Sequence, residues 1–116
     1  MKISVSAKDK ARIGTPLKKQ REKDGKSLRG LAKECEMNFA VLHDIEEGNS
    51  FPTEKNFLQL MKKLNFSEKK RLELFDLYGI IKETAPPDVV EYLVKHRTVV
   101  CDIRKMINQE NEVTNS

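Results

Sequence analysis

The apolar residues between Ser27 and Gly48 form two short stripes separated by a three-residue interruption. Within each stripe the apolar residues recur at the three-to-four-residue spacing that places side chains on one face of an α-helix. The first stripe consists of Leu28, Leu31, Ala32 and Cys35, and the second of Val41, Leu42 and Ile45. The pattern predicts two helices of about eight residues whose apolar faces point into a core.

The residues that flank these stripes are suited to begin and end helices. Ser27 and Asn38 each stand just before a stripe, where a side-chain oxygen can accept a hydrogen bond from an early backbone N–H. Gly48 follows the second stripe and tolerates the positive φ that commonly ends a helix. Two short helices with a three-residue break have the length pattern of a helix-turn-helix.

Capping and spacing signals continue on both sides of this pair. Thr15 and Pro16 predict the start of a helix that ends at Gly25. Pro86 and Pro87 cannot lie inside a helix and predict a break. Between and beyond these points we expect four more helices, over residues 53–64, 67–79, 88–95 and 98–109. In the helix over 67–79, the main inward stripe is predicted to be Leu72, Phe75 and Tyr78, widened by Leu74 and Leu77.

The helices divide the chain into four segments. Residues 1–14 lack strong periodicity and are interpreted as a basic N-terminal arm that is flexible or only partly helical. Residues 15–80 are expected to form the helix-turn-helix domain, 86–109 a C-terminal helical extension, and 110–116 a frayed polar tail. The predicted fold class is all-α, with five helices in the domain followed by two C-terminal helices.

The stretch 27–48 resembles the Cro/CI-type (XRE, lambda-repressor-like) family of DNA-binding domains. In that family the pattern S-x-x-x-L-A is followed by a turn, a cap and a helix that ends I-E-x-G. The residues that carry the resemblance are Ser27, Leu31, Ala32, Met37, Asn38, Leu42, Ile45, Glu46 and Gly48. The resemblance covers about Ile13–Gly79 and, more weakly, Pro86–Leu93. It implies a lambda-repressor-like fold and a DNA-binding transcriptional regulator, either a small repressor or the antitoxin of a toxin pair.

Three further positions are interpreted through the resemblance. A basic residue of the family's first helix pairs with the glutamate of I-E-x-G, which implies a structural ion pair between Arg21 and Glu46 here. The family usually has glycine in the turn, where this chain has Glu36, and a left-handed side chain there costs on the order of 1 kcal/mol. The family often has a phosphate-binding glutamine after the serine, where this chain has Leu28, which cannot donate.

The outward face of the second helix is the candidate DNA-reading surface. The resemblance implies that this face enters the major groove, with its N-terminal end leading. The candidate base contacts are Asn38, Phe39, Ala40, His43 and Asp44. Glu47 also faces outward and repels phosphate, and no Arg or Lys is available for the common contact with guanine. The alternative is that Phe39 packs at the turn while His43 and Asp44 form an ordinary solvated face.

The net charge of +4 is distributed unevenly along the chain. Residues 1–33 hold 11 Lys and Arg against 3 Asp and Glu, residues 34–66 hold 3 against 6, and residues 67–116 hold 8 against 9. A basic N-terminal third next to the helix pair fits a polyanionic partner such as double-stranded DNA, although lysine-rich helices are also ordinary solvated surfaces. The candidate phosphate contacts are Lys26, Ser27, Arg29, Asn49, Ser50 and Lys55.

The C-terminal helices carry more apolar surface than a five-helix domain needs. The residues concerned recur at helical spacing and are Leu93, Val99, Ile103, Met106 and Ile107. If this surface stayed exposed, it would be large for a soluble monomer, so we expect it to form a homodimer interface. The alternative is a monomer in which both helices fold back on the domain.

Several function classes lack support in the sequence. Gly-rich phosphate loops, HExxH, CxxC and nucleophile-elbow patterns are absent, so an enzyme is not expected. Cys35 and Cys101 have no metal-ligand spacing, and neither a metal nor another cofactor is predicted. The sequence has no apolar run near 18 residues, so we expect a soluble cytoplasmic protein without a membrane partner. The alternative function is a protein-interaction module, with a toxin or another regulator as its partner, that no longer binds DNA.

Overall fold

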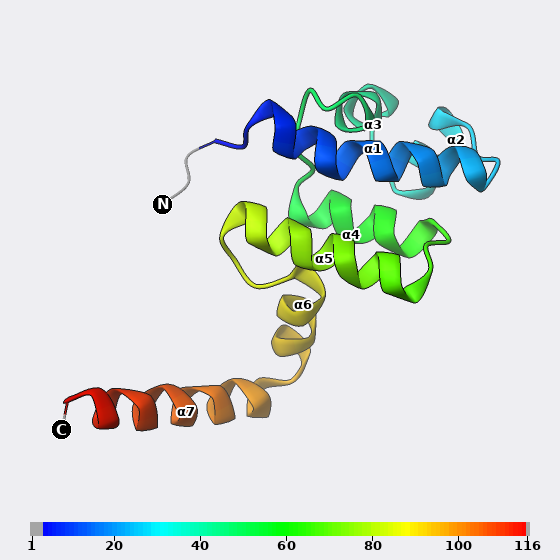
Figure 1. Cartoon of the computed structure of the whole chain (residues 1–116). Helices are drawn as coiled ribbons and strands as arrows, with labels where there is room; N and C mark the ends of the chain where they lie inside the picture. Colours follow the sequence, from blue (N-terminus) through cyan, green and yellow to red (C-terminus); the bar gives the residue numbers. More distant parts are fainter. Residues whose placement is uncertain (1–3, 116) are drawn as a thin grey trace.

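A computed structural model describes residues 4–115, and within that range every regular element is an α-helix (Figure 1). The helices are α1 (Ala7–Lys23), α2 (Leu28–Glu34), α3 (Phe39–Glu46), α4 (Glu54–Lys63), α5 (Glu68–Lys82), α6 (Pro87–Lys95) and α7 (Arg97–Asn115). The all-α prediction is therefore confirmed for the described residues. No helix in this range is both long enough and apolar enough to cross a bilayer.

Helices α1 to α5 share one aliphatic and aromatic core, and α6 and α7 lead away from it (Figure 1). Helix α1 packs against α3 and α5, and α2 packs against α3 and α4. The core residues that are fully enclosed include Ile13, Leu17, Leu31, Leu42, Ile45, Phe57, Leu60 and Met61. The Cα radius of gyration is 16.9 Å, against roughly 13 Å for a compact chain of this length, because the C-terminal helices project.

The start of α1 differs from the sequence prediction. Helix α1 begins at Ala7 rather than at Thr15, with the Ser6 hydroxyl accepting from the backbone N–H of Asp9, and Pro16 lies inside it. An interior proline costs about 3 kcal/mol, but the longer helix buries Ile13 completely. The packing of Ile13 in the core therefore outweighs the helix-start signal of Thr15 and Pro16. The predicted helix start at Thr15 is thus wrong, and the predicted arm is helical over Ala7–Gly14, while residues 1–3 lie outside the described range.

The connection between α2 and α3 has the geometry that the sequence favours. Ser27 and Asn38 cap the two helices, with their side chains accepting from the N–H of Gly30 and Ala40 at 2.9 and 2.8 Å. Glu36 adopts φ = 55°, the left-handed conformation in which glycine is usual.

The turn after α2 is held by backbone hydrogen bonds. The N–H of Met37 donates to the Ala32 carbonyl, and that of Glu36 donates to the Lys33 carbonyl. Together these bonds close the end of α2 as a Schellman motif, so the turn keeps its shape at the cost of one strained side chain.

Helix α5 is buried through a different stripe from the one predicted. Leu74, Phe75, Tyr78 and Ile81 are buried, whereas Leu72 is 51% exposed. Helix α5 also continues past Gly79 to Lys82, where Glu83 ends it with φ = 57°. The chain from Thr84 to Pro86 then crosses back over Gly79 so closely that a Cβ there would lie 2.8 Å from the Thr84 carbonyl oxygen. This crossing directs α6 away from α5.

Helix α7 runs as a long arm from the end of α6 (Figure 1). It continues to Asn115 rather than ending near Gln109, so the predicted frayed tail is helical as far as the structure describes it. Ser116 lies outside the described residues. The predicted break before α6 is confirmed, with Pro86 as its N-cap and Pro87 at its first position.

Candidate nucleic-acid interface

Helix α3 buries a narrow stripe and leaves its remaining surface exposed. Leu42, Ile45 and Glu46 face inward. All five candidate base contacts, Asn38, Phe39, Ala40, His43 and Asp44, are exposed. Val41 was predicted to face inward but is 41% exposed, because it is offset from Leu42 by about 100° around an eight-residue helix. The sequence therefore predicted the exposed face of α3 correctly but wrongly assigned Val41 to the core.

The N-terminal end of α3 carries an aromatic ring covered by a cation. The Arg29 guanidinium lies over the Phe39 ring, 3.9 Å from its centroid. Such a contact contributes about 0.5–1 kcal/mol at an exposed site. It brings a positive charge from α2 to the first turn of α3. Next to it, Asn38 uses its side-chain oxygen as the cap, which leaves its amide N–H groups to donate outward.

The Glu46 carboxylate, at the inward end of α3, is held by Arg21 in the predicted ion pair. The Arg21 Nε and Nη2 atoms donate to the two Glu46 oxygens at 2.8 and 3.0 Å, and Arg21 Nη1 donates to the Lys26 carbonyl at 2.9 Å. The two side chains are only 12% and 2% exposed. The hydrogen bond to Glu46 raises the pKa of Arg21, against the opposing effect of burial. The pair fixes α1 to the end of α3.

A second ion pair on the same two helices was not predicted. Lys18 Nζ donates to Glu47 Oε2 at 2.8 Å, one helical turn before Arg21 along α1. This hydrogen bond and the accompanying charge attraction raise the pKa of Lys18 and lower that of Glu47. No signal within one helix indicates this pair, because it depends on how α1 and α3 are rotated against each other. Glu47, expected to repel phosphate, thus has a cationic partner, while the Asp44 carboxylate lies 3.9 Å from the His43 ring nitrogen.

The candidate phosphate contacts are not equally available. The Lys26 ammonium donates to Glu34 at 2.9 Å and to the Lys63 carbonyl at 2.7 Å, so it joins the segment before α2 to the end of α4. Because these bonds hold the ammonium within the protein, Lys26 is less available to a phosphate than the other candidates. Ser27 caps α2 through its oxygen and keeps its hydroxyl proton free to donate.

The loop after α3 and the start of α4 carry three more phosphate candidates. The backbone N–H groups of Asn49 and Ser50 donate to the Asp44 carbonyl at 2.9 and 3.2 Å, which orders the loop. Lys55 is exposed in the first turn of α4. The first turns of α1 lie against this loop, since a Cβ on Gly48 would be 3.4 Å from Ala11. Lys8, three residues before Ala11, is on the same side of α1 and adds positive charge beside the loop.

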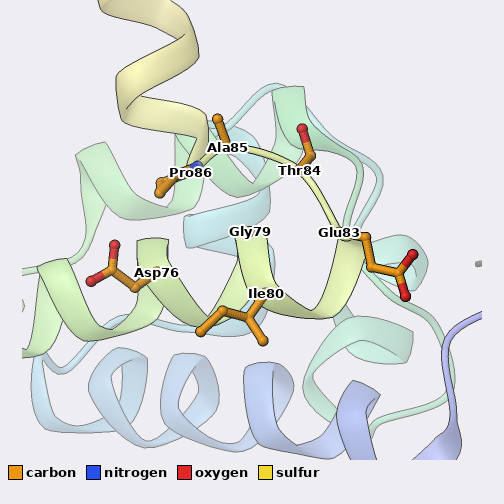
Figure 2. A pocket seen from close by; sticks show the side chains of 7 residues that line it. All are labelled: Asp76, Gly79, Ile80, Glu83, Thr84, Ala85 and Pro86. Carbon is orange, nitrogen blue, oxygen red and sulfur yellow. The ribbon is translucent and has the colours of Figure 1, made fainter. Parts of the chain in front are cut away.

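A depression in the described surface lies elsewhere, where the chain turns from α5 into α6 (Figure 2). Its volume is about 640 Å³, and it is shallow. Figure 2 shows the carboxylates of Asp76 and Glu83 at opposite ends, with Ile80 between them. Polar groups do not converge in it as they do in a ligand site. The described residues also contain no cluster of His, Cys, Asp or Glu that could hold a metal ion.

Comparison with known proteins adds no further assignment. No family model, no curated protein and no solved structure matches this chain.

Proposed function

We propose that the protein is a sequence-specific DNA-binding regulator of transcription with a lambda-repressor-like helix-turn-helix, and that α3 reads the major groove. The observation that carries this proposal is the exposed face of α3, on which Asn38, Ala40 and His43 present donors or a small apolar group beyond a buried stripe. An α-helix fits the major groove, where its N-terminal residues can reach base edges.

The contacts of the two glutamates at the end of α3 support the proposal. A free carboxylate beside the phosphate backbone would oppose binding. Arg21 holds Glu46 and Lys18 holds Glu47, so both carboxylates have cationic partners. Arg29 at one end of α3 and Lys55 beyond the loop add positive charge at the rim of the same surface.

A second function, protein interaction, is favoured by one observation. Phe39 and Val41 are each 41% exposed on α3, and Asp44 lies on the same helix. An apolar pair beside a carboxylate suits a protein surface with a basic residue better than it suits a phosphate backbone. The partner in this reading is a toxin or another regulator.

Selection of bound sequences from a random DNA duplex pool, using the full chain, tests the two functions against each other. The proposed function predicts enrichment of a defined short motif. Recovery of unselected sequence, or of no DNA at all, would overturn it in favour of protein interaction.

A charge substitution on the proposed reading face tests the role of α3. Ala40→Glu should weaken binding to the selected duplex at least about tenfold, because like charges at an interface cost several kcal/mol. Glutamate in the first turn of a helix is compatible with folding. The matched control is Ala85→Glu, which adds the same charge at an exposed alanine between α5 and α6. Equal effects of the two substitutions would argue against reading by α3.

A further inference from the structure

The apolar face of α7 has little cover within its own chain. Helix α7 packs mainly against α6, which half-buries Val99 and Val100. Beyond that contact, Ile103, Ile107 and Met106 are 37%, 49% and 64% exposed. These three residues continue the helical stripe of Val99 along the projecting arm seen in Figure 1.

The composition of α7 makes an isolated helix unfavourable. Five β-branched residues lie in its first eleven positions and have modest helix propensity; they are Thr98, Val99, Val100, Ile103 and Ile107. Most helical stability in proteins comes from packing an apolar face rather than from propensity. Helix α7 therefore needs a surface beyond the one that α6 supplies.

The order of charges along α7 identifies that surface. Before Met106 the helix has Arg97, Arg104 and Lys105 against one acidic residue. After Met106 it has Glu110 and Glu112 and no basic residue. This order is the reverse of the one that the helix dipole favours, which is acidic residues first and basic residues last. The charges are therefore not arranged to stabilise α7 alone.

We propose that α7 pairs in antiparallel orientation with α7 of a second copy of this chain, about a twofold axis near Met106 and Ile107. Antiparallel pairing places the basic half of each helix beside the acidic half of the other. A parallel pair would place like charges together. The axis lies near Met106 because the sign of the charge changes between Lys105 and Glu110. The same patch is buried on both subunits, as twofold symmetry requires.

The inference concerns assembly and does not depend on DNA binding, so it is tested without DNA. An interface of one helix per subunit is small, and we expect the mass in light scattering to rise from 13.4 kDa towards twice that value across the micromolar range. A mass that stays at 13.4 kDa at all concentrations would overturn the proposal and favour a monomer.

Two matched substitutions test whether the apolar face makes the contact. Ile103→Asp should abolish dimerisation. Cys101→Asp adds the same charge two residues earlier, about 160° around the helix, and should leave the dimer intact. Helicity measured by circular dichroism, together with an unchanged unfolding transition of the α1–α5 body, distinguishes loss of pairing from global unfolding. A dimer that survives Ile103→Asp would show that another surface pairs.

Charge exchange tests the orientation. Arg104→Glu with Lys105→Glu should weaken dimerisation. Adding Glu110→Lys and Glu112→Lys to the same chain should restore it. The acidic and basic halves of α7 are then exchanged, so an antiparallel pair again places opposite charges side by side. Failure of the fourfold variant to recover, while it remains helical, would contradict the antiparallel arrangement.

Disulfide trapping gives a second test of orientation. In a Cys101→Ser background, Ile107→Cys should crosslink two chains, since residues near the axis lie close to their own copies. Val99→Cys should not crosslink, because antiparallel pairing separates the two positions by about 20 Å along the helices at 1.5 Å per residue. Efficient crosslinking through Val99→Cys would indicate a parallel pair and overturn the proposal.

Discussion

The backbone of Gly14 in α1 lies so close to Ile45 in α3 that a Cβ at position 14 would overlap the Ile45 carbonyl oxygen. Gly14 is buried in the middle of its helix, where alanine would otherwise be preferred. The absence of a side chain allows α1 to approach the carboxyl end of α3. This approach also brings Lys18 and Arg21 within reach of Glu47 and Glu46.

Gly14→Ala should therefore destabilise the protein, although alanine favours an isolated helix. Overpacking commonly costs about 1–3 kcal/mol, and backbone atoms cannot rotate away as side chains do. We expect a lower urea midpoint in the variant. Thr15→Ala, at an exposed neighbouring position, should change the midpoint little. A more stable Gly14→Ala protein would show that helix propensity outweighs this contact.

Arg21→Ala should lower the free energy of unfolding by about 3 kcal/mol or more, because it leaves the nearly buried Glu46 carboxylate without its partner. Arg12→Ala on the same helix removes an ion pair with Asp9 in which the arginine is 52% exposed. Its cost should stay within about 1 kcal/mol. Thermal unfolding of the two variants provides the comparison, and equal transitions would contradict a structural role for Arg21.

The Arg21–Glu46 pair shows how much of the candidate site could be predicted from the sequence. Its two residues belong to the pattern that resembles a known family, and the capping residues Ser27 and Asn38 follow from local chemistry. The Lys18–Glu47 pair joins residues 29 positions apart in the sequence and depends on how α1 and α3 are rotated against each other. Periodicity within one helix does not contain that information.

The start of α1 was unpredictable for a related reason. Thr15 and Pro16 are a strong local start signal, but Ile13 is fully buried against residues that lie far along the chain. In α5, the apolar residues are spread around much of the helix, so their spacing did not determine that Leu72 would face solvent and Ile81 the core. Tertiary packing therefore determined where α1 begins and which face of α5 is buried, and the local sequence is compatible with more than one answer to each.

Asp24 should contribute stability that is lost in acid. Its carboxylate accepts from the Asn65 backbone N–H at 2.9 Å and from the Gln20 amide at 2.8 Å. The first of these bonds contributes most to lowering the pKa of Asp24 from its ordinary value of 3.8, and the second adds to it. A pKa lowered in the folded state gives stability that is present above the ordinary value and lost as the pH falls through the lowered one.

Asp24→Asn removes this ionisation and should be less stable than the wild type at pH 7. The difference should shrink as the pH falls below about 4, where the unfolded carboxyl becomes protonated. Urea unfolding at pH 7 and pH 3 measures both differences. If the free energy of unfolding differs between Asp24→Asn and the wild type by the same amount at both pH values, the charge of Asp24 contributes nothing to stability.

Lys55 and Lys69 offer a matched test of phosphate contact. Each is exposed and follows a glutamate at the start of a helix, Lys55 in α4 after the Thr53 cap and Lys69 in α5 after the Ser67 cap. Only Lys55 lies just beyond the loop that follows α3. If it neutralises a phosphate, Lys55→Ala should weaken binding to all duplexes about equally.

The salt dependence of affinity gives the quantitative form of this prediction. Loss of one phosphate contact reduces the slope of log affinity against log salt concentration by roughly 0.9, since fewer counterions are released on binding. Fluorescence anisotropy with one selected and one unrelated duplex, from low to moderate salt, should show that change for Lys55→Ala and none for Lys69→Ala. If Lys55→Ala alters sequence preference but keeps the wild-type salt slope, Lys55 contacts a base edge instead. If Lys55→Ala and Lys69→Ala have the same salt slope, the N-terminus of α4 is not part of the interface.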